Sequence, residues 1–199
     1  MPTNRGYLFI HIPRTGGTLC EKELLQIEGK WPTGIPHQLW GIIKDPKGNR
    51  YTGQHMTLKQ VGCFLSKEEQ RKLITFSIVR NPYDRSVSLF YYWGGPKKWS
   101  FHVFLLKVQA IMRGQKVKGL APYHIWPQTK YLQNEAGKID LLLLRFERLK
   151  DELKTHFDFD SAFDPQRQHR ANSFVMTPSE RQLVQEIYKD DFINLNYPL

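Results

Sequence analysis

Residues Tyr7 to Leu25 read YLFIHIPRTGGTLCEKELL, and this segment indicates the class of fold. Its apolar start is typical of a buried β-strand, and the strand leads into a turn that contains Arg14, Gly16 and Gly17. After the turn, leucines and charged residues recur at helical spacing. We therefore predict a strand, a tight turn and a helix, which is the opening unit of an α/β fold.

The same order of elements recurs twice later in the chain. LITFSIVR is an apolar, strand-like run that ends before Asn81, and Pro82 suits the first position of the helix that follows. IDLLLLRFE predicts another buried strand, followed by a helix near Leu149 to His156. Strands that alternate with helices imply a parallel sheet that is covered on both faces. At 199 residues, the chain is predicted to be a single domain over residues 1–199.

The remaining segments carry weaker local signals. RYTGQHM predicts a short strand that ends near His55, and residues 66–69 have the spacing of a capping box before a short helix. Apolar spacing predicts a helix over 101–113. Residues 177–180 combine an N-cap, a proline and an acid, which predicts a closing helix over PSERQLVQEIYKDDF. Residues 27–48 show no period and are predicted to be irregular.

Composition limits the partners and the compartment. The formal charge of +10 and the pI near 9.6 favour an anionic partner, although charge alone does not identify it. Two cysteines, Cys20 and Cys63, form neither a disulfide framework nor a spaced metal set. No basic segment leads into a long apolar run after Met1, so we expect a soluble, cytoplasmic protein without a membrane partner.

The turn at residues 14–18 is suited to bind a phosphate. Backbone N–H groups at a helix start are unpaired and point outward, and the helix dipole adds positive charge there. Glycines allow the backbone to approach an anion closely, while Arg14 supplies a planar, permanently charged fork. The turn lacks the Lys-Ser/Thr pair of a Walker A loop. A turn that merely packs remains the alternative at this point.

Two motifs resemble those of a known family. FIHIPRTGGT resembles the 5′-phosphosulfate loop of sulfotransferases that use 3′-phosphoadenosine 5′-phosphosulfate (PAPS). The similarity is strongest to the carbohydrate group, which includes the heparan sulfate 2-O- and 6-O-sulfotransferases. FSIVRNPYDRSVSLFYYW is similar to the 3′-phosphate motif of the same family. The resemblance implies a three-layer, P-loop-like fold, PAPS as the donor co-substrate and 3′-phosphoadenosine 5′-phosphate (PAP) as the product.

The resemblance also implies which residues bind the donor. Arg80 and Ser88 would hold the 3′-phosphate, and HRANSF is similar to a family segment near the nucleotide, which adds Asn172 and Ser173. The family usually has lysine at the position of Arg14, where it is thought to stabilise charge on the leaving phosphate, so Arg14 is also a catalytic candidate. The residues implied to hold the 5′-phosphosulfate are Arg14, Thr15, Gly16, Gly17 and Thr18.

Sulfuryl transfer to a hydroxyl group also needs a base, and no metal is chemically required. Histidine titrates in the useful range. His55 lies in YTGQHMTL, which resembles the family segment that carries the catalytic histidine, and it is the predicted general base. Glu147 is a second candidate base or orienting carboxylate, although a glutamate at a helix start can act on the dipole alone. The other histidines are given smaller roles. Strand alternation places His11 beneath the sheet or beside Tyr7 and Phe9, packing or acceptor contact is expected of His37, His102 and His124, and nucleotide contact of His169.

The sequence therefore predicts a sulfotransferase that moves a sulfuryl group from PAPS to an acceptor hydroxyl, on a glycan, with no nucleic acid partner. Residues 27–48 and 93–118 do not match the family and are the predicted acceptor-recognising segments. A P-loop kinase that uses ATP is one alternative, but it needs a magnesium-binding hydroxyl and a strand-end aspartate. A non-catalytic binder of polyanions is another, and it leaves Arg80 and Ser88 without a shared purpose.

Overall fold

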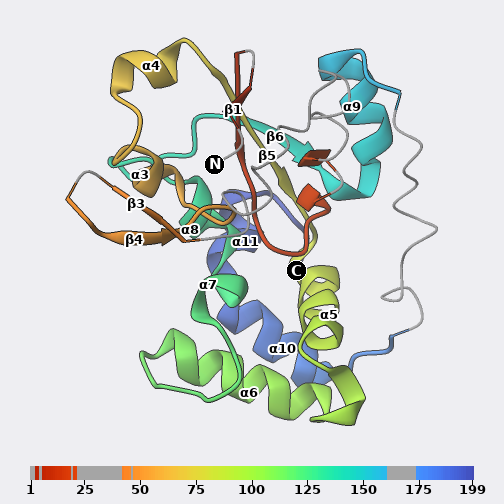
Figure 1. Cartoon of the computed structure of the whole chain (residues 1–199). Helices are drawn as coiled ribbons and strands as arrows, with labels where there is room; N and C mark the ends of the chain where they lie inside the picture. Colours follow the sequence, from red (N-terminus) through yellow and green to blue (C-terminus); the bar gives the residue numbers. More distant parts are fainter. Residues whose placement is uncertain (1–2, 5, 19, 22–41, 46, 161–173) are drawn as a thin grey trace.

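The centre of the protein is a β-sheet with the strand order β1-β2-β5-β6 (Figure 1). The computed structural model describes residues 3–4, 6–18, 20–21, 42–45, 47–160 and 174–199. Strands β2, β5 and β6 are parallel, and β1 lies antiparallel to β2 at the edge. This confirms the predicted α/β fold with a central parallel sheet. The strands are β1 (Thr3–Asn4), β2 (Tyr7–Ile10), β5 (Ile74–Val79) and β6 (Leu142–Arg145).

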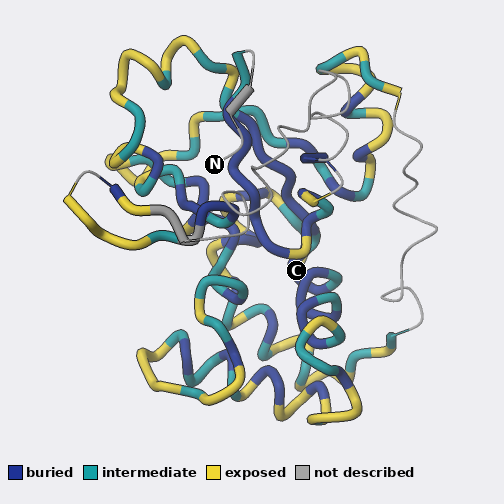
Figure 2. Tube along the Cα trace, viewed as in Figure 1, coloured by how far each residue is buried: buried dark blue, intermediate teal, exposed yellow. Residues whose placement is uncertain are grey.

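Successive strand residues point to opposite sides of the sheet, so both faces carry apolar side chains. Helices cover both faces and bury these side chains. Leu8 and Ile10 of β2 pack in one apolar cluster with residues of α3, α8 and the end of α11. Phe9 packs in another cluster, together with residues of η2 and α9. Figure 2 shows that the central strands are buried. The helices of these two layers are α3 (Leu58–Val61), α8 (Gln128–Leu132), α11 (Lys189–Asn194), the 3-10 helix η2 (Phe146–Arg148) and α9 (Leu149–Phe157).

Three longer helices pack against one another below the sheet in the view of Figure 1. They are α5 (Pro82–Tyr92), α6 (Phe101–Met112) and α10 (Pro178–Ile187). Pro82 occupies the first turn of α5, and the Asn81 side chain accepts the N–H of Tyr83 at 3.0 Å. The predicted starts of α5 and α6 are thus confirmed, and α5 leaves the carboxyl end of β5 directly.

A separate two-stranded sheet corrects part of the sequence prediction. Strands β3 (Ile42–Lys44) and β4 (Arg50–Thr52) pair as an antiparallel hairpin, so residues 42–44 are not irregular. The predicted strand before His55 exists but ends at Thr52. The Asp45 carboxylate closes the hairpin by accepting the backbone N–H of Asn49 at 2.8 Å. Residues 27–41 lie outside the described part of the chain.

The predicted closing helix is divided at Tyr188, between α10 and α11. The Tyr188 hydroxyl donates to the Ile125 carbonyl at 3.0 Å. One turn later, the buried Asp191 carboxylate accepts the backbone N–H groups of Gln128 and Thr129 at 2.8 and 2.9 Å. These tertiary hydrogen bonds override the continuous helical period, which sequence periodicity alone does not reveal.

The remaining elements are short helices. The capping box predicted at residues 66–69 is present at the start of α4 (Lys67–Arg71). The others are η1 (Gly95–Lys97) and α7 (Pro122–Ile125). Among the described residues, none of the helices combines the length and the apolar character that crossing a membrane requires.

Candidate active site

The turn after β2 is packed so tightly that two positions require glycine. Gly16 has a φ of +88°, and a Cβ atom there would lie 2.9 Å from the Phe146 ring. A Cβ atom at Gly17 would lie 2.3 Å from the ring of His11. Residues 17, 18, 20 and 21 are helical, so the turn leads into a helix as predicted. Arg14 also has a positive φ, of 67°, an uncommon conformation for a residue with a side chain.

The two motifs of the sequence meet at the carboxyl edge of the sheet. Strands β2 and β5 are parallel neighbours, so the segments that follow them emerge side by side. The Arg14 Nε atom donates to Ser88 Oγ at 3.0 Å, and Arg80 Nη1 donates to the Arg14 carbonyl at 3.3 Å. The structure therefore brings Arg14 into contact with Arg80 and Ser88, which lie 66 and 74 residues later in the chain.

Arg80 keeps a positive charge in this mostly buried setting. Its guanidinium lies 4.3 Å from the centre of the Phe146 ring, and burial lowers the pKa of Arg80 to about 10. The nearby carboxylates of Asp84 and Glu147 act in the opposite direction and favour the charged form. Since this pKa is still well above neutral, Arg80 is a fixed cation.

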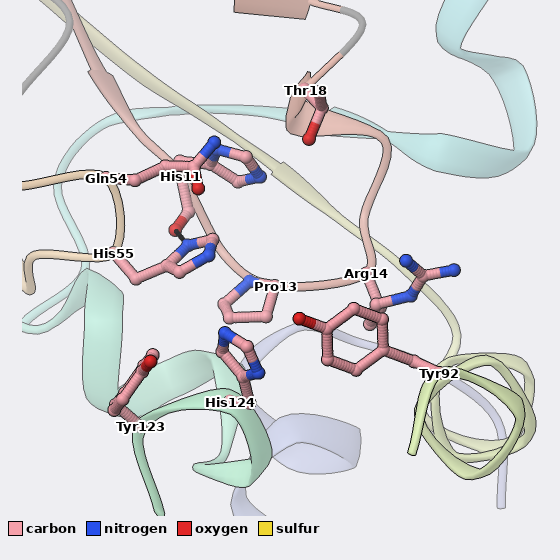
Figure 3. A pocket seen from close by; sticks show the side chains of 9 residues that line it. All are labelled: His11, Pro13, Arg14, Thr18, Gln54, His55, Tyr92, Tyr123 and His124. Carbon is pink, nitrogen blue, oxygen red and sulfur yellow. Dashed lines mark hydrogen bonds between the residues drawn. The ribbon is translucent and has the colours of Figure 1, made fainter. Parts of the chain in front are cut away.

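A pocket of about 250 Å³ opens beside the turn (Figure 3). Arg14 and Thr18 line it from the turn, His55 lines it from the loop after β4, and α5 and α7 supply aromatic side chains. One end of the pocket therefore has the cation Arg14 and the start of a helix, and the other end has imidazole and aromatic rings. Its lining residues are His11, Pro13, Arg14, Thr18, Gln54, His55, Tyr92, Tyr123 and His124.

His55 is oriented as a proton acceptor. Its Nδ1 atom lies 3.0 Å from the His11 carbonyl, which can only accept, so Nδ1 carries the hydrogen. The Nε2 atom is then the nitrogen with the free lone pair. Burial, and secondarily His11, lowers the pKa of His55 to about 3, so the ring is neutral at neutral pH.

Two histidines that the sequence assigned to smaller roles also line the pocket. The His11 ring lies 4.6 Å from the ring of His55, and the His124 ring lies 5.2 Å from it. β2 ends at Ile10, so strand alternation no longer orients His11. His124 lies on a helix of four residues that carries no readable period. Desolvation, and then the charge of Arg14, lowers the pKa of His124 to about 4.

Two predicted site residues make structural hydrogen bonds instead of facing the pocket. The buried Thr15 hydroxyl donates to the Ile12 carbonyl at 2.8 Å, so its proton is not directed at a ligand. The Glu147 carboxylate accepts the Asn81 N–H at 2.6 Å and the Tyr197 hydroxyl at 3.1 Å. These bonds connect η2 with the start of α5 and with Tyr197. Asn172 and Ser173 lie outside the described residues, as do His37 and His169.

The fold and the site together define an α/β protein with a glycine-containing turn and two arginines at the carboxyl edge of its sheet. The model of the Sulfotransferase family matches residues 3–198, so the chain belongs to this family. It is accordingly a transferase that moves a sulfuryl group. A search of the curated proteins finds no match to this chain.

Among the described residues, no group of three or more His, Cys, Asp or Glu side chains is arranged to hold a metal ion.

Proposed function

We propose that the protein, acting as one domain, transfers a sulfuryl group from PAPS to a hydroxyl group of a carbohydrate. The observation that carries this proposal is the contact between the two phosphate motifs, Arg14 to Ser88 at 3.0 Å and Arg80 to the Arg14 carbonyl at 3.3 Å. A single donor with a phosphate at each end fits two cationic turns that meet beside one pocket.

The donor is held at both ends. The backbone N–H groups of residues 16–18 and the Arg14 fork bind the 5′-phosphosulfate, because helix-start amides and a guanidinium both favour an anion. Arg80 and Ser88 bind the 3′-phosphate, as a fixed cation and a hydroxyl donor from neighbouring elements. Both ends of the nucleotide are thereby fixed before an acceptor arrives.

The transfer is an in-line displacement at sulfur. The acceptor hydroxyl oxygen forms the new S–O bond, its proton passes to Nε2 of His55, and the S–O bond to the 5′-phosphate breaks. Arg14 stabilises the charge that develops on the leaving phosphate. An anion in the pocket favours the charged imidazolium, so donor binding raises the pKa of His55 from its low value in the free protein.

The acceptor side of the pocket favours a carbohydrate with anionic groups. Tyr92 and Tyr123 present aromatic surface that can pack against a sugar ring. The segment from Arg85 to Asn134, which supplies these tyrosines, contains no Asp or Glu, so it favours anions over a long range. Its basic residues are Arg85, Lys97, Lys98, Lys107, Arg113, Lys116, Lys118 and Lys130.

Calorimetry with PAP and ADP tests the proposal. We expect PAP to bind at least tenfold more tightly than ADP, because ADP lacks the 3′-phosphate that Arg80 and Ser88 would hold. Tighter binding of ADP would favour the kinase. If neither nucleotide binds and the protein is retained on heparin or DNA, a non-catalytic binder of polyanions is favoured.

A further inference from the structure

A buried carboxylate outside the proposed proton-transfer step connects three parts of the site. Glu21 Oε1 lies 2.8 Å from His11 Nδ1, and Glu21 Oε2 accepts the Gln54 side-chain amide at 2.9 Å. Glu21, His11 and Gln54 are 3%, 3% and 7% exposed. One side chain on the first helix thus holds both the end of β2 and the loop after β4.

These contacts close a ring of bonds around His55. Gln54 is the residue directly before His55 in the chain, and the carbonyl of His11 accepts from His55 Nδ1 at 3.0 Å. Glu21 therefore fixes His55 from two sides, through the residue before it and through the residue whose carbonyl selects its tautomer. If either side moves, His55 Nδ1 loses its acceptor and the free lone pair is no longer confined to Nε2.

The number of hydrogen-bond acceptors explains why an acid suits position 21. A carboxylate can accept two hydrogen bonds with no donor of its own, so it satisfies His11 Nδ1–H and the Gln54 amide together. A glutamine of the same shape has one acceptor oxygen and an NH₂ group, so it serves both neighbours only if His11 moves its hydrogen from Nδ1 to Nε2 or the Gln54 amide turns over. Without such a rearrangement a buried donor loses its acceptor, and the ring opens at one point.

We propose that Glu21 is a positioning residue, which acts through His11 and Gln54 to hold His55 in the tautomer and orientation that accept a proton. This role rests on the proposed sulfotransferase function, but the geometry on which it acts can be measured without turnover. The conservative variant that removes the second acceptor is Glu21→Gln. Glu68→Gln is the matched control, because Glu68 is an exposed residue of α4 that pairs with Lys72.

Nitrogen NMR of histidine side chains tests the geometric half of the proposal. We expect the wild-type protein and Glu68→Gln to show His55 as the Nδ1–H tautomer, and Glu21→Gln to show a mixture of tautomers. Unchanged His55 resonances in both Glu21→Gln and Gln54→Leu would overturn the proposal, whether or not the protein proves to be a sulfotransferase, because Gln54→Leu breaks the ring even where His11 adapts to a glutamine at position 21. If Glu21→Gln does not fold, Gln54→Leu opens the same ring at its other side and should give the same mixture.

Kinetics tests the functional half. We expect Glu21→Gln to lower kcat at least tenfold while the KM for PAPS stays within about twofold, which separates positioning from donor binding. In a His55→Ala background, Glu21→Gln should lower kcat less than twofold further, since its effect passes through His55. An equal loss in both backgrounds would overturn the positioning role and indicate a structural one. Absence of turnover in the wild type, with normal tautomers, would instead contradict the proposed function.

Discussion

At the residue scale, the tautomer of His55 decides which atom can take a proton. The His11 carbonyl holds the hydrogen on Nδ1 at 3.0 Å, which leaves Nε2 as the basic atom. We expect His55→Ala to bind PAP within about threefold of the wild type, because the alanine leaves the turn and Arg80 intact. Turnover should fall by about 10²–10⁴, the usual contribution of a positioned base. A variant with wild-type turnover would contradict the assignment of the base.

The neutral histidines give stability a pH dependence on the acid side. The folded-state pKa values of His55 and His124 are lowered, mainly by burial, to about 3 and about 4 from an ordinary 6.5. As the pH falls below about 6.5, these histidines gain protons in the unfolded chain before they do so in the folded protein. Stability should therefore decrease as the pH falls from about 6.5 toward 4.

A variant separates this effect from the titration of carboxylates. His124→Gln removes one of the two groups, so its stability should fall less steeply than that of the wild type between the same pH values. Denaturant unfolding at several pH values measures both slopes. Parallel slopes would show that His124 does not titrate differently in the folded and unfolded states.

The residues of the site differ in how far the sequence could predict them. Arg14, Arg80 and Ser88 lie in motifs with fixed spacing after strands, so their meeting could be expected from a parallel sheet. His11 and His124 could not be placed, because one lies just past a strand end and the other on a four-residue helix. The hydroxyl direction of Thr15 could not be predicted either, since a hydroxyl in a phosphate-type turn can also bond its own backbone.

At the scale of elements, the turn after β2 functions only if the first helix can pack against His11. A Cβ atom at Gly17 would lie 2.3 Å from the His11 ring, which Glu21 holds in place. We expect Gly17→Ala to reduce the free energy of unfolding by about 1–3 kcal/mol, as overpacking usually does. It should also weaken PAP binding, because the helix-start amides move.

The control for this variant is another glycine with an ordinary backbone conformation. Gly62 ends α3 with a φ of −59°, and a Cβ atom there would lie 3.2 Å from the Lys59 carbonyl oxygen. Gly62→Ala should leave PAP binding unchanged and alter stability by less than about 1 kcal/mol. Equal effects of the two substitutions on PAP binding would contradict the specific role of the Gly17 turn.

Among the elements, those with strong local signals could be predicted and those fixed by distant contacts could not. The apolar runs of β2, β5 and β6 and the proline start of α5 are readable in the sequence. The division of the closing helix depends on Tyr188 and Asp191, whose partners lie more than 60 residues away. The β3–β4 hairpin is three residues per strand, too short for a period to appear.

At the scale of the whole molecule, one buried arginine connects the turn, α5 and the α7 region. Arg85 is 1% exposed and donates to the carbonyls of Pro13, Trp126 and His124 at 3.0, 3.0 and 3.2 Å. We expect Arg85→Met to lower the free energy of unfolding by about 3–5 kcal/mol, because one buried and two partly buried carbonyls lose their donor. Denaturant unfolding measures this loss.

Arg148→Met is the control, because the Arg148 side chain is exposed and forms a surface ion pair with Glu152. Surface pairs contribute about 0–1 kcal/mol, so this variant should be nearly neutral. A similar small loss for Arg85→Met would mean that the pocket walls are held together by apolar packing alone. The hydrogen bonds of Arg85 would then not explain why this cation is buried near His55 and His124.

In the proposed complex, two separate turns hold the two ends of one nucleotide, and a thermodynamic cycle measures this arrangement. Calorimetry would compare PAP with ADP on the wild type and on Arg80→Ala, with Arg71→Ala on exposed α4 as the control. We expect Arg80→Ala to weaken PAP binding about tenfold to a hundredfold and ADP binding less than twofold, because only PAP carries the 3′-phosphate. Equal weakening of both nucleotides, or of neither, would contradict the claim.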